Sequence, residues 1–219
     1  MPAPRILFET PHLLALDKPA GLSVERDPHG HASLEQWVHD ELSKRYRNPY
    51  VGIVHRLDRR VSGVMLVAKK RSALRKLNAQ FAERRTTKIY HALVGQAPPK
   101  PAGRLQHYLD RDPRRKRAVA HAKKVAKTNK EAVLHYEILE QLPDGYLLEV
   151  RPVQGRFHQI RVQLAAAGCP IVGDELYGGR SWKHRDAIAL HAAELRFRHP
   201  VTDKVLFARA PAPWLPNKR

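Results

Sequence analysis

The stretch GIVHRLDRRVSGVMLVAKK, residues 52–70, joins a charged segment to an apolar run. Residues 61–68 are small or aliphatic with one serine, a composition typical of a strand buried on both faces. One acid, Asp58, stands just before this run among Arg56, Arg59 and Arg60. Neighbouring positive charge stabilises a carboxylate. Asp58 therefore suits a base, a metal ligand, a nucleophile or one half of a structural ion pair.

The charge of the whole chain indicates a polyanionic partner. Its 219 residues include 40 Lys and Arg against 21 Asp and Glu, a formal net charge of +19 (40 − 21). At this size such an excess favours binding to nucleic acid. The alternative is that the charge serves solubility alone.

The apolar spacing predicts many strands and few helices. Helical spacing occurs over residues 33–46 and 72–85, with Ser33 and Ser72 as candidate N-caps, and again from Phe157 to Gly168. Strand-like runs cover residues 6–9, 13–18, 63–70, 89–96, 133–142, 146–153 and 189–199. Because several strands follow one another directly, we predict an α+β fold with a mixed, largely antiparallel sheet and flanking helices.

The length and composition predict one domain. A chain of 219 residues with 42% hydrophobic residues can bury a full core. We therefore assign residues 1–219 to a single domain, compact or divided into two lobes.

A basic segment at residues 111–130 contains nine Lys or Arg against one acid, and follows a Pro-rich turn or linker at residues 97–103. Charge runs of this kind often form a solvated hairpin. We favour the alternative, in which the segment binds nucleic-acid phosphates, because phosphate contacts need only cations within reach. The candidate phosphate-binding residues are Arg114, Arg115, Lys116 and Arg117.

The cysteine and histidine patterns argue against disulfide and metal chemistry. Cys169 is the only cysteine, so no internal disulfide and no paired-cysteine zinc site can form. The 13 histidines are scattered without metal-ligand spacing. These patterns predict a protein without a metal. The first residues carry neither a signal peptide nor a membrane span, so we expect the protein to be cytoplasmic.

Five blocks of the sequence, in order, resemble the RluA-type family of RNA pseudouridine synthases. VHRLDRRVSG, residues 54–63, resembles the family's HRLD motif. The other blocks are ALDKPAGLSV (15–24), TKIYHALV (87–94), RPVQGRFHQIRVQLAAAGCPIVGDELYG (151–178) and ALHAAELRFRHP (189–200). Four positions depart from the usual family residues: Asp17 for Asn, Val61 for Thr, Phe157 for a small polar residue and Gln163 for His.

The resemblance implies a fold and a set of catalytic residues. It implies the pseudouridine synthase fold, with a central RNA-binding cleft and no cofactor. Asp58 would be the nucleophile, acting at C6 of uracil or at C1′ of the sugar. Arg161 would pair with Asp58 and orient it, unless it is a surface cation. Tyr90 would stack on the uracil with its hydroxyl near the C5 proton, unless it is a core tyrosine.

Uridine in an RNA stem must be extruded before it reaches a carboxylate in a cleft. The resemblance places Arg56 in the vacated space. His55 is a candidate substrate contact, with a role in shaping the strand as an equal alternative. The loops at residues 18–21 and 173–177 are assigned supporting roles.

Target selection is assigned to the catalytic domain, because only about a dozen residues precede the first motif, too few for a separate S4 RNA-binding domain. We expect a monomer that acts on an rRNA or tRNA stem-loop, with no membrane contact.

Two other classes of protein remain as alternatives. One is an RNA-binding or assembly factor without chemistry. The other is a metal-dependent nuclease, which would need clustered acids, whereas Asp58 has no acidic neighbour in sequence.

Overall fold

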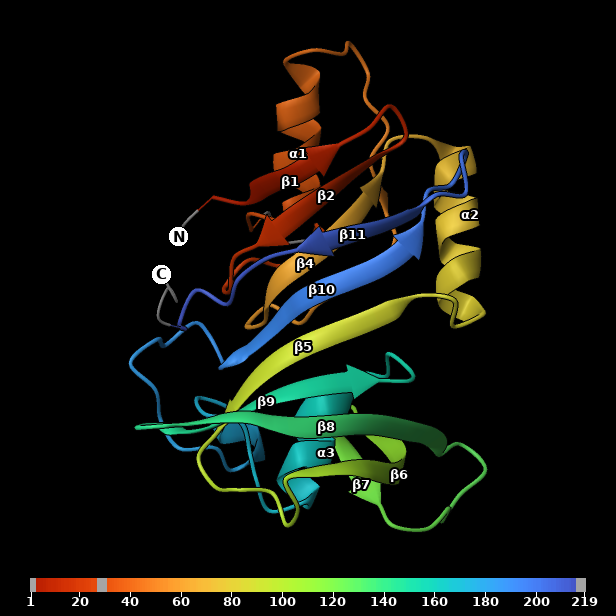
Figure 1. Ribbon diagram of the computed structural model, residues 1–219. Helices are drawn as coiled ribbons and strands as arrows, with labels where there is room; N and C mark the ends of the chain where they lie inside the picture. The colour runs from red at the N-terminus through yellow and green to blue at the C-terminus, as the bar shows by residue number, and fades with distance from the viewer. Residues whose placement is uncertain (1–2, 27–30, 216–219) are drawn as a thin grey trace. The chain divides into compact units, whose positions relative to one another are not determined.

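The protein folds into two compact units. The structure, a computed structural model, describes residues 3–26 and 31–215. The first unit combines both ends of the chain, Met1–Lys88 and His191–Arg219, and the second is the continuous segment Ile89–Leu190. Figure 1 follows the chain through both units.

The first unit contains a mixed set of strands and two helices. One parallel pairing, between β4 and β10, joins strands that are otherwise paired antiparallel. The strand order is β1 (Arg5–Glu9), β2 (Leu13–Lys18), β4 (Ser62–Ala68) and β10 (Leu190–Arg198), with β11 (Val205–Arg209) on β10 and β3 (Gly52–Ile53) on β4. The helices are α1 (Leu34–Ser43) and α2 (Arg71–Ala82).

Strand β4 is the centre of this unit. All its residues are buried, as the apolar run predicts. Helix α2 packs against it, and Leu77 of the helix shares a core cluster with Leu66 and Phe197. Gly63 has a φ of +117°, and a Cβ there would lie 2.3 Å from the carbonyl oxygen of Ala192. Only glycine therefore allows β10 to approach β4 so closely.

The helix ends test the predicted caps. The Ser33 side chain accepts a hydrogen bond from the Gln36 amide, which confirms the cap of α1. The predicted Ser72 cap is wrong, because α2 already begins at Arg71 and its N-cap is Lys70, without a side-chain bond. Gly168 lies beyond the third helix with a φ of +79°, as expected of a C-terminal glycine.

The second unit is an antiparallel set of strands with a short helix. Helix α3 (Gln159–Ala166) packs against β6, β7 and β9, and a 3₁₀ turn, η1 (Glu175–Tyr177), contacts it. The strand order is β5 (Thr87–Val94), β9 (Gly145–Pro152), β8 (Lys130–Leu142), β6 (Ala102–Asp112) and β7 (Arg117–His121). The predicted α+β class is confirmed.

The sequence did not predict four strands: β3, β6, β7 and β11. Strand β6 alternates exposed and partly buried residues, several of them charged, so it lacks an apolar run. Its place is set by pairing with β7 and β8. Within the described part of the chain, no helix is long and apolar enough to span a membrane.

Candidate active site

Asp58 lies in the first unit, in the loop that leads into β4, and its side chain is half-buried. A turn holds its backbone, since the Val61 amide donates to the Asp58 carbonyl at 3.0 Å. The next residue, Arg59, bonds twice to Gly21: the Gly21 amide donates to the Arg59 carbonyl at 2.8 Å, and Arg59 Nε donates to the Gly21 carbonyl at 2.8 Å. The Asp58 loop is therefore clamped to the loop at residues 18–22.

Lys18 is the centre of this clamp. Its side chain is fully buried, and Nζ donates to the carbonyls of Pro19 (2.9 Å), Leu22 (2.8 Å) and Arg59 (3.3 Å). Burial lowers the pKa of Lys18 to about 7, while the charge of Asp58 acts in the opposite direction. The three carbonyls match the three N–H groups of the ammonium form, and the charge of that form lies near Asp58.

A buried serine–histidine pair holds the start of β4. Ser62 Oγ lies 2.8 Å from His191 Nδ1, and His191 Nε2 lies 2.9 Å from the carbonyl oxygen of Ala210. Because Nε2 must donate to the carbonyl, Nδ1 of the neutral ring accepts from the Ser62 hydroxyl. The bonds tie β4, four residues after Asp58, to β10 and to the segment after β11.

Arg56 and His55 have different surroundings. Arg56 is largely exposed, and its Nη1 lies 3.1 Å from Glu25 Oε2. His55 stacks on Phe81 at 4.8 Å, and its Nε2 accepts a hydrogen bond from the Leu66 amide at 3.1 Å. Burial, and then the charge of Lys88, lowers the pKa of His55 to about 3, so the ring is neutral. These contacts give His55 a packing role, and its contact with substrate stays a prediction.

Arg161 lies in the second unit on α3 and is paired with Asp174. Nε and Nη2 donate to the two carboxylate oxygens of Asp174 at 2.7 and 2.8 Å. The side chains are only 6% and 0% exposed, which rules out a simple surface cation. The guanidinium also lies over the Tyr177 ring, 5.1 Å from its centroid. Such a bidentate, buried pair fixes the direction of the arginine.

Glutamine side chains hold α3 in place. Gln159 Nε2 donates to the Val133 carbonyl at 3.0 Å, and Gln163 Nε2 donates to the Ala132 carbonyl at 3.0 Å. Six of the eight residues of α3 are buried, polar ones included. On a surface helix the side-chain amides of Gln159 and Gln163 would bond to water; here they bond to strand β8. These bonds restrict the movement of Arg161.

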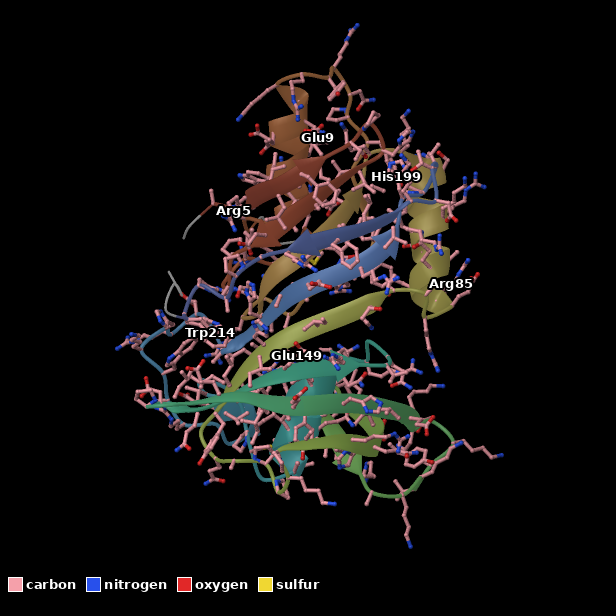
Figure 2. The ribbon with its side chains drawn as sticks, in the orientation of Figure 1. Arg5, Glu9, Arg85, Glu149, His199 and Trp214 are labelled. Atoms are coloured by element: carbon pink, nitrogen blue, oxygen red, sulfur yellow. The ribbon has the colours of Figure 1, made fainter. Side chains whose placement is uncertain are left out.

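The other candidates also lie in the second unit. Tyr90 is half-buried in β5, opposite Val150 of β9. Residues 113–116 form an exposed turn between β6 and β7, and Arg117 begins β7. The segment is thus a hairpin, and its contact with RNA stays a prediction. Figure 2 shows nitrogen-tipped side chains projecting outward from the ribbon.

The predicted catalytic residues and the two substrate contacts beside Asp58 fall in two groups. Asp58, Arg56 and His55 belong to the first unit, whereas Tyr90 and Arg161 belong to the second. The pairing of Arg161 with Asp58 therefore stays a prediction. Sequence reasoning missed the Arg161–Asp174 and Arg56–Glu25 pairs. Asp174, in the block GDELYG at residues 173–178, was the only signal for the first of them.

Metal-ligand geometry does not occur among residues 3–26 and 31–215, where no group of three or more His, Cys, Asp or Glu side chains could hold a metal ion.

Solved structures define the fold class. Human RNA pseudouridylate synthase domain containing 4 matches with a TM-score of 0.77 at 23% identity, over 96% of this chain and 89% of the other. Human RNA pseudouridylate synthase domain containing 1 matches with a TM-score of 0.77 at 26% identity, over 98% and 85%. The fold is that of pseudouridylate synthases.

Sequence comparison gives the family. The model of the RNA pseudouridylate synthase family matches residues 12–166, and the chain belongs to this family. Ribosomal large subunit pseudouridine synthase C of Vibrio vulnificus is 37% identical over 215 residues, covering 94% of this chain and 65% of that protein. The protein of the same name from Escherichia coli K12 is 36% identical over 220 residues, covering 94% and 66%. The chain thus spans about two thirds of the length of these relatives.

Proposed function

We propose that this protein is an RNA pseudouridine synthase that isomerises uridine in structured RNA, with Asp58 as its nucleophile. The observation that carries the proposal is the position of Asp58 in a chain that belongs to the pseudouridylate synthase family. Contacts of Lys18, Gly21 and Arg59 hold the Asp58 loop at the start of β4. The names of the relatives point to large-subunit ribosomal RNA as the substrate.

The reaction is an isomerisation and balances without an oxidant or reductant. The N1–C1′ bond of uridine breaks and a C5–C1′ bond forms. C5 loses its proton, and N1 gains one. Asp58 supplies the carboxylate that attacks C6 of the base or C1′ of the sugar, which divides one difficult step into two.

The remaining residues position the substrate. Arg161, held by Asp174, presents its guanidinium to Asp58 and keeps the carboxylate charged. Tyr90 stacks on the uracil, with its hydroxyl near the C5 proton. Arg56 leaves Glu25 and fills the space of the extruded nucleotide, since an exposed ion pair is weak enough to exchange for RNA.

Affinity for RNA comes from the exposed cations of the turn between β6 and β7, which bind phosphates without reading the sequence. We propose that the protein acts as a monomer in the cytoplasm.

The test uses ribosomal RNA transcribed with uridine that carries tritium at C5, because isomerisation releases this label to water. Wild-type protein should release tritium, and Asp58→Asn should lower the single-turnover rate by several orders of magnitude while RNA binding persists. Asp203→Asn is the matched control, since Asp203 is 78% exposed and its carboxylate bonds to Arg198, five residues away.

Near-normal tritium release by Asp58→Asn would refute the role of Asp58. RNA binding by the wild type without any release from ribosomal or transfer RNA would instead favour a binding factor without chemistry. Mapping of pseudouridines in cellular RNA with and without the protein then identifies the position modified.

A further inference from the structure

An exposed aromatic side chain in the second unit carries a stack of planar groups. Phe157 lies between β9 and α3 and is 40% exposed. The His158 imidazole stacks on its ring, with centroids 3.8 Å apart and 19° between the planes. The exposed Arg111 guanidinium lies over the same ring, 4.8 Å from the centroid. A phenylalanine so exposed contributes little to a core, which suggests a binding role.

The inner end of this stack is rigidly supported. His158 has a φ of +52°, a left-handed conformation that a non-glycine residue adopts only when its surroundings hold it there. Its Nδ1 lies 2.9 Å from the hydroxyl oxygen of Tyr177. The same oxygen accepts a hydrogen bond from the Ala118 amide at 2.7 Å. Phe157 is therefore presented from a fixed base.

The stack continues from the surface to Arg161. The ring of Tyr177 meets the His158 ring edge to face, with centroids 5.7 Å apart, and lies beneath the guanidinium of Arg161. Asp174 holds Arg161 from the other side. All these residues belong to the second unit, so a contact at Phe157 is mechanically linked to Arg161 within one compact body.

The local charge selects the class of ligand. Arg111 lies near the end of β6, and four further cations follow it by residue 117 against a single acid, Asp112. Aromatic rings beside cations are the means by which proteins bind unpaired nucleotides, because bases stack on the rings while the cations bind phosphates. An acidic protein partner could pair with the cations, but it would give no role to the exposed Phe157 ring.

We propose that Phe157 and Arg111 form a stacking site for an unpaired base of the substrate RNA, a base other than the target uridine. The inference rests on the proposed function in that the ligand is RNA. An exposed cation–π contact is weaker than the stacking of a base. The base therefore takes the place of Arg111 on the ring, and the guanidinium turns to a neighbouring phosphate.

The test compares two RNA probes, a single-stranded 12-mer with one central 2-aminopurine and a 12-base-pair duplex without unpaired bases. Fluorescence anisotropy gives the affinity, and quenching of 2-aminopurine reports stacking directly. Phe157→Leu keeps the apolar volume but removes the aromatic face. It should weaken single-strand binding by about 5- to 150-fold and remove the quenching. Duplex binding should be unchanged.

Three controls separate stacking from other effects. Phe157→Tyr keeps a ring and should retain both affinity and quenching. Leu139→Ala removes a side chain of similar exposure, 46%, from β8 and should change neither. The slope of log affinity against log salt should be the same for Phe157→Leu and wild type, because the same phosphates remain bound.

If Phe157→Leu bound the single strand as tightly as wild type and quenched 2-aminopurine equally, the proposal would be overturned. Phe157 would then only pack over the His158 ring. Equal losses for single strand and duplex would also overturn it, because they would indicate a general effect on the surface. The binding assay involves no isomerisation, so tritium release by the wild type tests the proposed function separately. Loss of stacking with intact catalysis is thus distinguishable from a failure of the catalytic assignment.

Discussion

Replacing Asp174 with Asn removes the charge that faces the buried guanidinium of Arg161 and preserves the shape of the side chain. In the wild type, Asp174 accepts from Nε and Nη2 of Arg161. The Asn amide group would turn a donor towards these donors. Arg161 would remain buried with its charge uncompensated on this side.

The magnitude follows from the burial of both partners. With side chains 6% and 0% exposed, the pair is within the class for which loss of one partner costs about 3 to 5 kcal/mol. For a chain of this length, each kcal/mol shifts Tm by about 2 to 4 °C, so Tm should fall by about 6 to 20 °C. Turnover should also fall, because Arg161 loses its fixed direction.

Thermal melts and urea titrations measure the loss of stability, and tritium release measures turnover. Asp144→Asn is the matched control in the same unit, because Asp144 is 77% exposed and lies 3.7 Å from Arg180. An exposed pair of this kind contributes at most about 1 kcal/mol. The double variant Arg161→Met with Asp174→Leu should regain much of the stability but no activity, since an apolar pair replaces the buried charges.

If Asp174→Asn melted as close to wild type as Asp144→Asn does, the buried Arg161–Asp174 pair would not stabilise the fold as proposed. Recovery of activity by the apolar double variant would equally contradict a role for the Arg161 guanidinium in positioning Asp58.

Three further predictions concern the basic turn, acid stability and metal dependence. Neutral replacements of residues 114–117 should lower the log–log salt slope of RNA binding by about 0.7 to 0.9 for each phosphate that is no longer bound, with the single-turnover rate at saturating RNA unchanged; an unchanged slope would favour a merely solvated hairpin. Burial lowers the pKa of His55 from 6.5 to about 3. Between these two pH values the imidazole is therefore protonated in the unfolded chain and neutral in the folded protein. Stability should therefore fall as pH drops from 6.5 towards 3, by up to about 1.4 kcal/mol per pH unit from this group, and urea titrations at pH 7 and 5 should show a smaller fall for His55→Gln. Chelators should leave turnover intact, because the proposed chemistry needs no Lewis acid; loss of activity that a divalent ion restores would contradict this, provided that the RNA stays folded.

The local elements could be predicted from the sequence, because side-chain periodicity and end residues act over a few positions. The run at residues 61–68 predicts the buried strand β4, and Ser33 predicts the start of α1. The HRLD motif similarly identified the region of Asp58. Strand β6 escaped prediction because its residues alternate around charged side chains, and its pairing partners lie elsewhere in the chain.

The order of motifs and the nature of the site residues were determined by the sequence alone, including the family to which the chain belongs. The contacts of those residues were decided only by the tertiary structure. Arg161 bonds to Asp174, 13 residues away and beyond the end of a helix, and Lys18 bonds to the carbonyl of Arg59, 41 residues away. Periodicity carries no information about such pairs, because they form only when packing brings distant backbone and side chains together and excludes the water that would otherwise bind them.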